Sequence, residues 1–474
     1  MSSRTRVGLA LLGVALSVGL LWAFVVPPWQ APDEWRHFEY VKLILEEGRL
    51  VSSRDISPEI MREIIDSMVR HNYWQFGYAY YPYDPSNPPQ SFEEIVPDWI
   101  AHSLYHPPAY YAAAALFISP LSRSGVDQQL LAARVFSVLL GALSVAIAYG
   151  TARAIFPQEE ALSRLAPLIV ALLPMHAFIN ASVNSDALAE LMVSLLIFQW
   201  VVILRRGLSP LLAIGVVFAT VVGFLTKRIT VMSLPISAVG LLLWLTGKPW
   251  RSLSTGKLAA VGMGLILGMA GMAALLTWRD EICGFMPGAC QFVLRYPRYL
   301  VIPEDIGTFI LNPGYYTAEA FRTYFFWAQT LFESFWARFG WMNVRPDPYL
   351  YWLLGGFTLA SGFGLIHFLV RHALRGDLEA SQWRSIIFLL LTFPLALVVI
   401  FFGHLRSVEL YPIGPPQGRF LLPVVVPIAL MLAMAAQGLW PKVGDRRLTL
   451  GYGVGFLFLN LFCLARYILP FYYR

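Results

Sequence analysis

The chain has 474 residues, of which 57% are hydrophobic, 15% are aromatic and only 14% are charged. A soluble domain usually carries about 25% charged residues, so this composition indicates a polytopic membrane protein. The net charge of +6 is not a nucleic-acid footprint, because much of it lies in short loops between apolar runs, where it sets orientation. We therefore expect membrane lipids as partners and no nucleic acid.

The first apolar run extends from Val7 to Val26, after the basic residues Arg4 and Arg6. Its length of about 20 residues is enough to span a bilayer. No small-residue cleavage site precedes Pro27, which favours a retained membrane anchor over a secretory signal peptide. Because positive charge is enriched on cytoplasmic loops, we expect a cytoplasmic N-terminus and an outer location for the stretch after residue 26.

That stretch begins with PPWQAPDEWRHFEY, which places Asp33 and Glu34 next to each other and His37 within the next turn. Ionisable groups at a membrane edge are costly, so they are candidates for function. The structural alternative is a helix start, because acidic residues in the first turn oppose the helix dipole. Both interpretations are open from these residues alone.

The next apolar segment, from His106 to Leu121, is bounded by prolines and is short for a span, so we expect a re-entrant or interfacial helix. Basic residues then mark alternate loops as cytoplasmic, and the C-terminus is expected outside. The hydrophobic pattern predicts about eleven spans, at about 7–26, 130–151, 163–181, 187–204, 210–226, 229–246, 258–277, 349–370, 386–402, 420–438 and 448–468.

The predicted fold is a single all-α transmembrane domain covering residues 1–474, with two long outer loops, 27–129 and 278–348. The loops should carry interfacial helices. Cys283 and Cys290 share the second outer loop, where a small disulfide is one interpretation and two free thiols the other.

Further candidate residues occur at other outer span ends. Asp186 and Glu190 are spaced i, i+4 on one helix face, although Asp186 also suits a helix cap. Lys227 and Arg228 form a basic pair against the positive-inside bias, which an anionic ligand or simple snorkelling would explain. Arg419 precedes an inward span and suits bidentate contact with a phosphate.

Carboxylates and cations at one membrane edge are typical of glycosyl transfer from a lipid donor. The cations would hold the phosphate of the lipid, and a carboxylate would act as general base toward an acceptor hydroxyl or amine. A divalent metal ion, Mg²⁺ or Mn²⁺, bound by Asp33 or Asp186 with His37 or His106 is an alternative, but no motif spacing supports it. His106 could equally cap the short helix that follows it.

The ordered motifs resemble the GT-C superfamily of membrane glycosyltransferases, and in particular a bacterial multi-spanning branch of it. This superfamily includes protein O-mannosyltransferases and the aminoarabinose transferase of lipid A. Each motif is weak alone, but the set covers most of the chain in order: PDE, HPPAYY, ARVFSVLLGALSVAIAYGTARAIF, LPMHAFINASVNSD, GFLTK, FWARFGW and QGRFLLP.

The resemblance implies roles for individual residues. It implies that Asp33 is the catalytic base with Glu34 as its support or alternate, and that Lys227 contacts the donor phosphate, with Arg228 beside it. It further implies a phosphate contact for Arg419 and an active-site position for Asp186, near the acceptor or a metal, with Glu190 and His106 as neighbours. The donor would be a polyprenyl-phosphate sugar, and the acceptor a cell-envelope glycan, lipid or protein outside the bacterial cytoplasmic membrane. The resemblance leaves the oligomeric state open.

A second class of function is also compatible with the composition. A transporter or flippase for a lipid-linked or anionic solute would be equally hydrophobic, but it would need polar groups at the middle of the membrane and broken helices. The charges of this sequence lie at the ends of the apolar runs, which favours the enzyme, whereas glycine-rich runs such as GMGLILGMAG favour the transporter.

Overall fold

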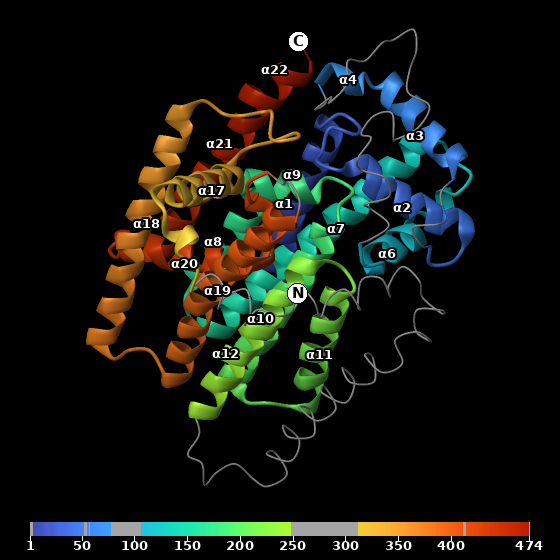
Figure 1. Cartoon of the computed structure of the whole chain (residues 1–474). Helices are drawn as coiled ribbons and strands as arrows, with labels where there is room; N and C mark the ends of the chain where they lie inside the picture. Colours follow the sequence, from blue (N-terminus) through green and yellow to red (C-terminus); the bar gives the residue numbers. More distant parts are fainter. Residues whose placement is uncertain are drawn as a thin grey trace.

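The computed structural model describes residues 3–51, 55, 57–76, 106–247, 311–410 and 414–473. All regular elements in these residues are helices, and the β pairing among them is a single isolated bridge between Phe339 and Val344. Cys283, Cys290 and the expected span at 258–277 lie outside the described residues. Figure 1 shows the helices coloured along the sequence, from blue at the N-terminus to red at the C-terminus.

Eight helices in the described ranges are long and apolar enough to cross a membrane, or up to nine if a bent pair counts as one span. The all-α membrane architecture is therefore confirmed, while the count of eleven is not. The long elements are α1 (Ser3–Val25), α7 (Val126–Ile155), α10 (Asp186–Arg206), η4 (Arg228–Met232) with α12 (Ser233–Thr246), α18 (Pro348–Arg375), α19 (Ala380–Leu410), η7 (Gly418–Val424) with α20 (Val425–Leu439), and α21 (Asp445–Cys463) with the π-helical turn η8 (Leu464–Ile468).

The remaining helices are shorter. Apolar α6 (Ala109–Ile118) with η3 (Ser119–Leu121) and apolar α11 (Pro210–Phe224) fall below the length of a span. The others are α2 (Glu34–Glu47), α3 (Pro58–Arg70), α4 (Tyr73–Phe76), α8 (Glu160–Leu172), α9 (Pro174–Asn180), η6 (Pro313–Tyr316), α17 (Ala318–Trp336) and α22 (Leu469–Tyr472).

The span expected at 163–181 is broken, which corrects the sequence-based prediction of one continuous helix. Helices α8 and α9 meet at an angle of 58°. Leu173 between them has an extended backbone, because a residue that precedes proline is disfavoured in the helical region, and Pro174 then begins α9. The bend directs the chain at residues 181–185 back to the start of α10.

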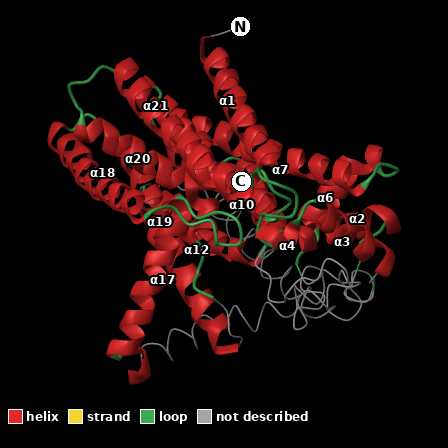
Figure 2. Ribbon diagram, turned by 90° about the horizontal axis from the view of Figure 1, so that it is seen from above, coloured by secondary structure: helices red, strands yellow, loops and turns green. Residues whose placement is uncertain are grey.

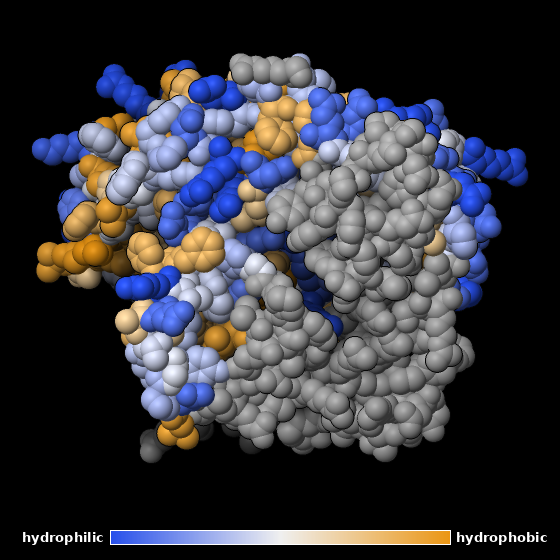
Figure 3. Space-filling view, turned by 45° about the horizontal axis from the view of Figure 1, so that its top comes forward, coloured by the Kyte–Doolittle hydropathy of each residue, from blue (hydrophilic) through white to orange (hydrophobic). Residues whose placement is uncertain are grey.

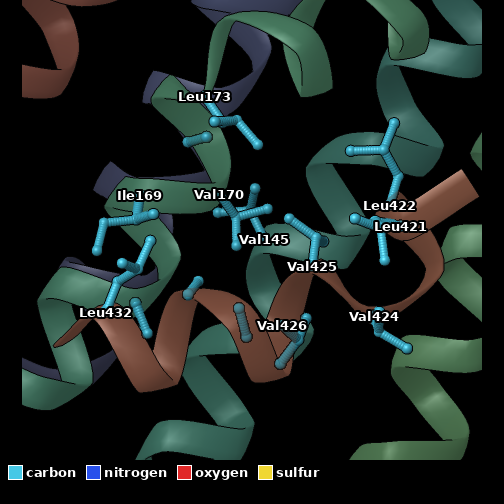
Figure 4. Close-up of a cluster of buried hydrophobic side chains, with 14 of the residues drawn as sticks. Val145, Ile169, Val170, Leu173, Leu421, Leu422, Val424, Val425, Val426 and Leu432 are labelled. Atoms are coloured by element: carbon cyan, nitrogen blue, oxygen red, sulfur yellow. The ribbon is translucent and has the colours of Figure 1, made fainter. Parts of the chain in front are cut away.

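Two apolar cores organise the helices. The larger one includes side chains of α7, α8, η7 and α20, and Figure 4 shows Val145, Val170, Leu422 and Val425 in it. The second lies among α2, α3, α6 and the first part of α7 and includes Trp29. Figures 1 and 2 show α2, α3 and α6 on the opposite side of the bundle from α18 and α20.

A buried ion pair joins the start of α2 to α7, and the same arginine binds carbonyl oxygens around the end of α1. Arg134 donates hydrogen bonds to both carboxylate oxygens of Glu34, at 2.7 and 2.6 Å. The same guanidinium donates to the carbonyl oxygens of Ala23, Val26 and Pro27, at 2.7 to 2.9 Å. These carbonyls come at or just after the end of α1, where a helix leaves acceptors without intrahelical partners. Arg134 thereby fixes where α1 ends and α2 begins.

We predict that Glu34→Gln strongly destabilises the protein. The substitution keeps the shape but leaves the positive charge of Arg134 buried without its counter-charge, which typically costs about 3–5 kcal/mol. Thermal unfolding of the purified protein in detergent, followed by tryptophan fluorescence, should show a clear drop in Tm.

Glu47→Gln is the matched control for this experiment. Glu47 pairs with Arg49 at the surface, where both side chains are about half exposed, at 47% and 52%. Exposed pairs contribute about 0–1 kcal/mol, so this variant should unfold within a degree or two of the wild type. Equal Tm values for the Glu34 variant and the wild type would contradict the role assigned to the Arg134 pair.

Candidate functional site

Asp33 lies in the turn between α1 and α2, directly before the first residue of α2. Its backbone is left-handed, with φ 60° and ψ 11°, a conformation that aspartate tolerates better than most other non-glycine residues. Asp33 directly precedes α2 and Glu34 is in its first turn, as the helix-start interpretation expects, but the Asp33 side chain makes no capping hydrogen bond to α2. Instead, Oδ2 lies 3.3 Å from Nη2 of Arg419, and the side chain is 25% exposed.

Arg419 comes from η7, far from Asp33 in sequence. Gly418 allows η7 to approach α17, because a Cβ atom there would lie 2.0 Å from the backbone nitrogen of Phe335. The Gly418 amide donates to Oγ of Ser334 at 2.7 Å, which fixes the start of η7. This contact holds the Arg419 side chain, 9% exposed, between the two carboxylates of the site.

Asp186 is the first residue of α10 and is fully buried. Its Oδ1 accepts a hydrogen bond from Nζ of Lys227 at 2.5 Å, and its Oδ2 lies 3.9 Å from Nε of Arg419. The backbone amide of Asp186 donates to Oδ1 of Asn184 at 2.9 Å. Asn184 therefore provides the local cap, and the Asp186 carboxylate is directed toward the two cations.

Lys227 lies in the short turn between α11 and η4. Burial is the largest influence on it and lowers the pKa of its amine, while the neighbouring Asp186 carboxylate opposes that shift. Arg228, the next residue, is exposed at the start of η4. Lys227, one of the two adjacent basic residues predicted to bind the donor phosphate, pairs with the buried carboxylate of Asp186.

These contacts form one continuous series of charges, Asp33–Arg419–Asp186–Lys227. Four separate segments supply them, and the formal charges sum to zero. We call these four residues the charge cluster. Figure 3 shows hydrophilic side chains over the middle of one face of the molecule, including several in a hollow near its centre.

Two histidines lie beside the charge cluster. The rings of His37 and His106 have centroids 5.5 Å apart, and His37 hydrogen-bonds to the hydroxyl of Tyr111 at 2.7 Å. Burial, followed by the charges of Lys227 and Arg228, lowers the pKa of His106 to about 3. Burial and the nearby cations likewise lower the pKa of His37 well below its usual range. Both rings are therefore neutral at physiological pH.

The predicted metal site at Asp33, His37 and Asp186 is not supported. Among the described ranges, no three His, Cys, Asp or Glu side chains come together as a ligand set. The contacts give a physical reason, because the Arg419 guanidinium lies close to both aspartates. We derive no step through a metal ion.

Glu34 and Glu190, the other two acidic candidates, are held apart from the charge cluster. Besides Arg134, Glu34 accepts hydrogen bonds from the backbone amides of Trp29 and Val183, at 3.0 and 3.1 Å. Glu190 bonds to Nε2 of His176 at 2.8 Å and accepts from Nδ2 of Asn180 at 3.0 Å. Both oxygens of each carboxylate are thus engaged.

Sequence reasoning missed several residues that build the site. Arg134 is a charge within an apolar span, which is itself a signal of function or of a buried partner. Asn184 lies in the motif LPMHAFINASVNSD and Tyr111 in HPPAYY, but their contacts come from tertiary packing. The backbone amide of Asn184, for example, donates to the hydroxyl of Tyr110 at 3.0 Å. No periodicity in the sequence indicates such contacts.

The arrangement offers two cations to an anionic ligand. Lys227 and Arg419 are largely buried, their charges are balanced by the two carboxylates, and an oxyanion is the kind of ligand that both side chains bind best. Asp33 is the partly exposed carboxylate of the cluster and so the one that an external nucleophile can reach. The cluster therefore combines a site for an oxyanion with an accessible base.

No curated protein matches the chain significantly. A solved structure of ArnT from Cupriavidus metallidurans, bound to undecaprenyl phosphate, is similar with a TM-score of 0.42 and 15% identity, over 99% of this chain and 74% of ArnT. This likeness is distant. The DUF2142 family of predicted membrane proteins matches residues 16–428, and the chain belongs to that family.

Proposed function

We propose that this protein is a GT-C glycosyltransferase that moves a sugar from a polyprenyl-phosphate lipid to an acceptor outside the bacterial cytoplasmic membrane. The single observation that carries the proposal is the charge cluster, in which an accessible carboxylate and two largely buried cations are in contact at the ends of apolar helices. The sequence motifs that resemble this superfamily contribute the same four residues.

In the proposed reaction, Lys227 and Arg419 bind the phosphate of the donor. The acceptor hydroxyl loses its proton to Asp33 while its oxygen bonds to the anomeric carbon. The bond between that carbon and the phosphate oxygen breaks, and its electron pair leaves with polyprenyl phosphate. The two cations stabilise the charge that develops on the leaving phosphate, because they are fixed and largely shielded from water.

The charge balance of the empty site supports this order of events. Without a ligand, each cation is neutralised by a carboxylate, which keeps four ionised groups stable in a poorly solvated place. Asp33 pairs with Nη2 of Arg419, so a phosphate bound at Nε and Nη1 would share the positive charge of the guanidinium and weaken that pairing. The Asp33 carboxylate would then be freer to accept the proton of the acceptor when the donor is bound.

The orientation of the chain is part of this proposal. The N-terminus would be cytoplasmic, and the charge cluster would face outside, where a lipid-linked sugar and a cell-envelope acceptor meet. Under the alternative function, transport of a lipid-linked or anionic solute, the same cations would bind the solute and leave it chemically unchanged.

We predict that Asp33→Asn lowers the rate of sugar transfer by about two to four orders of magnitude, which is the usual contribution of a general base. The purified protein would be given radiolabelled polyprenyl-phosphate sugar and an acceptor fraction, and release of free polyprenyl phosphate would be measured.

The Asp33→Asn variant should remain folded, because Arg419 still lies near the Asp186 carboxylate, and it should bind the donor at least as tightly as the wild type, since Asp33 does not contact the phosphate in the proposed complex. If the variant folds and releases polyprenyl phosphate at the wild-type rate, Asp33 is excluded as the base. Wild-type protein that binds the donor but leaves it intact with every acceptor would favour a transporter.

A second prediction concerns the cations. Arg419→Gln and Lys227→Gln should each weaken donor binding about tenfold or more, because a charge-assisted hydrogen bond to phosphate contributes about 1.5–3 kcal/mol. Binding of a short-chain polyprenyl phosphate, measured by scintillation proximity, gives the Kd values directly.

Arg70→Gln provides the control for these two variants. Arg70 is 55% exposed and pairs with Asp127 at 3.2 Å at the surface, so its loss should leave the Kd unchanged. If the two cluster variants bound polyprenyl phosphate as tightly as this control, the phosphate would have to bind elsewhere.

A further inference from the structure

Polar side chains of the site region have buried atoms without a geometric hydrogen-bond partner among the described residues. The atoms are Nε and Nη1 of Arg419, Oδ2 of Asp186, Nδ2 of Asn184 and Oγ of Ser185, and the first three side chains line the charge cluster or directly precede it. Asp186 and Asn184 are completely buried, and Arg419 is 7% exposed. Buried polar groups are nearly always paired in folded proteins, so these atoms require partners, which ordered water or a bound molecule can supply.

The three side chains do not require the same chemistry. Arg419 needs acceptor oxygens, which a phosphate supplies, and its Nε lies 3.9 Å from Oδ2 of Asp186. That carboxylate oxygen needs a hydrogen-bond donor, because its partner oxygen Oδ1 already accepts from Lys227. A phosphate diester has no hydrogen to give, so a phosphate alone satisfies Arg419 and leaves Asp186 unpaired beside another anion.

Asn184 further restricts the kind of chemical group that can pair with these side chains. Its Oδ1 accepts from the Asp186 amide and its backbone amide donates to the Tyr110 hydroxyl, so the side chain is fixed with Nδ2 as the remaining donor. Asn184 and Asp186 together therefore offer one donor and one acceptor. A hydroxyl group, which both donates and accepts, is the simplest group that pairs with both.

We propose that Asp186 and Asn184 form a subsite for the substituent at carbon 2 of the donor sugar. In a glycosyl phosphate, the anomeric carbon carries the phosphate and has two ring neighbours. The ring oxygen has no hydrogen, so the nearest donor is a hydroxyl or acylamino group at carbon 2. The proposal rests on the proposed function and restricts its substrates to sugars that carry such a group.

The experiment compares matched donors on the wild-type protein. Each ligand is a short-chain polyprenyl phosphate that carries glucose, mannose, galactose or arabinose, and its matched control carries the corresponding 2-deoxy sugar. The affinity of each is measured by its competition with radiolabelled sugar-free polyprenyl phosphate. For the best-bound sugar, removal of the 2-hydroxyl should weaken binding about ten- to hundredfold, since it leaves buried polar groups unpaired. Equal affinities within every pair would overturn the subsite.

Asp186→Asn tests the same idea from the protein side and should reduce the preference for the 2-hydroxy sugar to about threefold or less, because an amide replaces the anionic acceptor. Asp127→Asn, at the start of α7 and near Arg70, should keep the wild-type preference. A preference that survives unchanged in Asp186→Asn overturns the assignment.

Failure of the subsite and failure of the proposed function give different results. If sugar-free polyprenyl phosphate does not bind the wild-type protein at all, the proposed function is wrong. If it binds and the deoxy pairs do not differ, the subsite alone is wrong. Should Asp186→Asn fail to fold, the donor pairs on the wild-type protein still decide the question.

Discussion

The hydrogen bonds of one buried guanidinium determine the geometry on which the candidate site depends. Arg134 joins both oxygens of Glu34 to three carbonyl oxygens around the end of α1. Glu34 in turn accepts from the backbone amide of Val183, which lies three residues before Asp186. Through this pair, the turn that carries Asp33 and the segment that precedes α10 are fixed relative to each other. The two aspartates of the charge cluster are therefore positioned by a third, adjacent carboxylate.

Keeping so many ionised groups in a weakly solvated place has no obvious benefit for stability. Replacing a buried ion pair by apolar side chains of similar volume is often neutral or stabilising. The helices around the site already have extensive apolar contacts in two cores. The proposed binding of a phosphate would account for the presence of Asp186, Lys227 and Arg419 in this environment.

Much of the fold follows from periodicity and composition. The long apolar runs predict the spans, and Pro174 explains the break that the hydrophobic pattern alone missed. Among the candidate residues, local sequence could identify Asp33, Asp186, Lys227 and Arg419 because each lies at the end of an apolar run. It could not show that Glu34 and Glu190 face other partners, since Arg134 and His176 reach them only through tertiary packing. Nor could local sequence show that the Arg419 guanidinium lies close to both Asp33 and Asp186, the two aspartates of the metal hypothesis.

The left-handed backbone of Asp33 also restricts which residues can occupy that position. Glycine, asparagine and aspartate adopt this conformation at low cost, whereas other side chains, and β-branched ones above all, are disfavoured there on steric grounds. Glutamate at position 33 would carry the same charge but would strain the turn and extend the carboxylate by one carbon. A substitution at position 33 would therefore act in two ways, through the backbone conformation of the turn and through the chemistry of the side chain. Alanine and glutamate variants change both, so a loss of activity in either variant would combine the two effects.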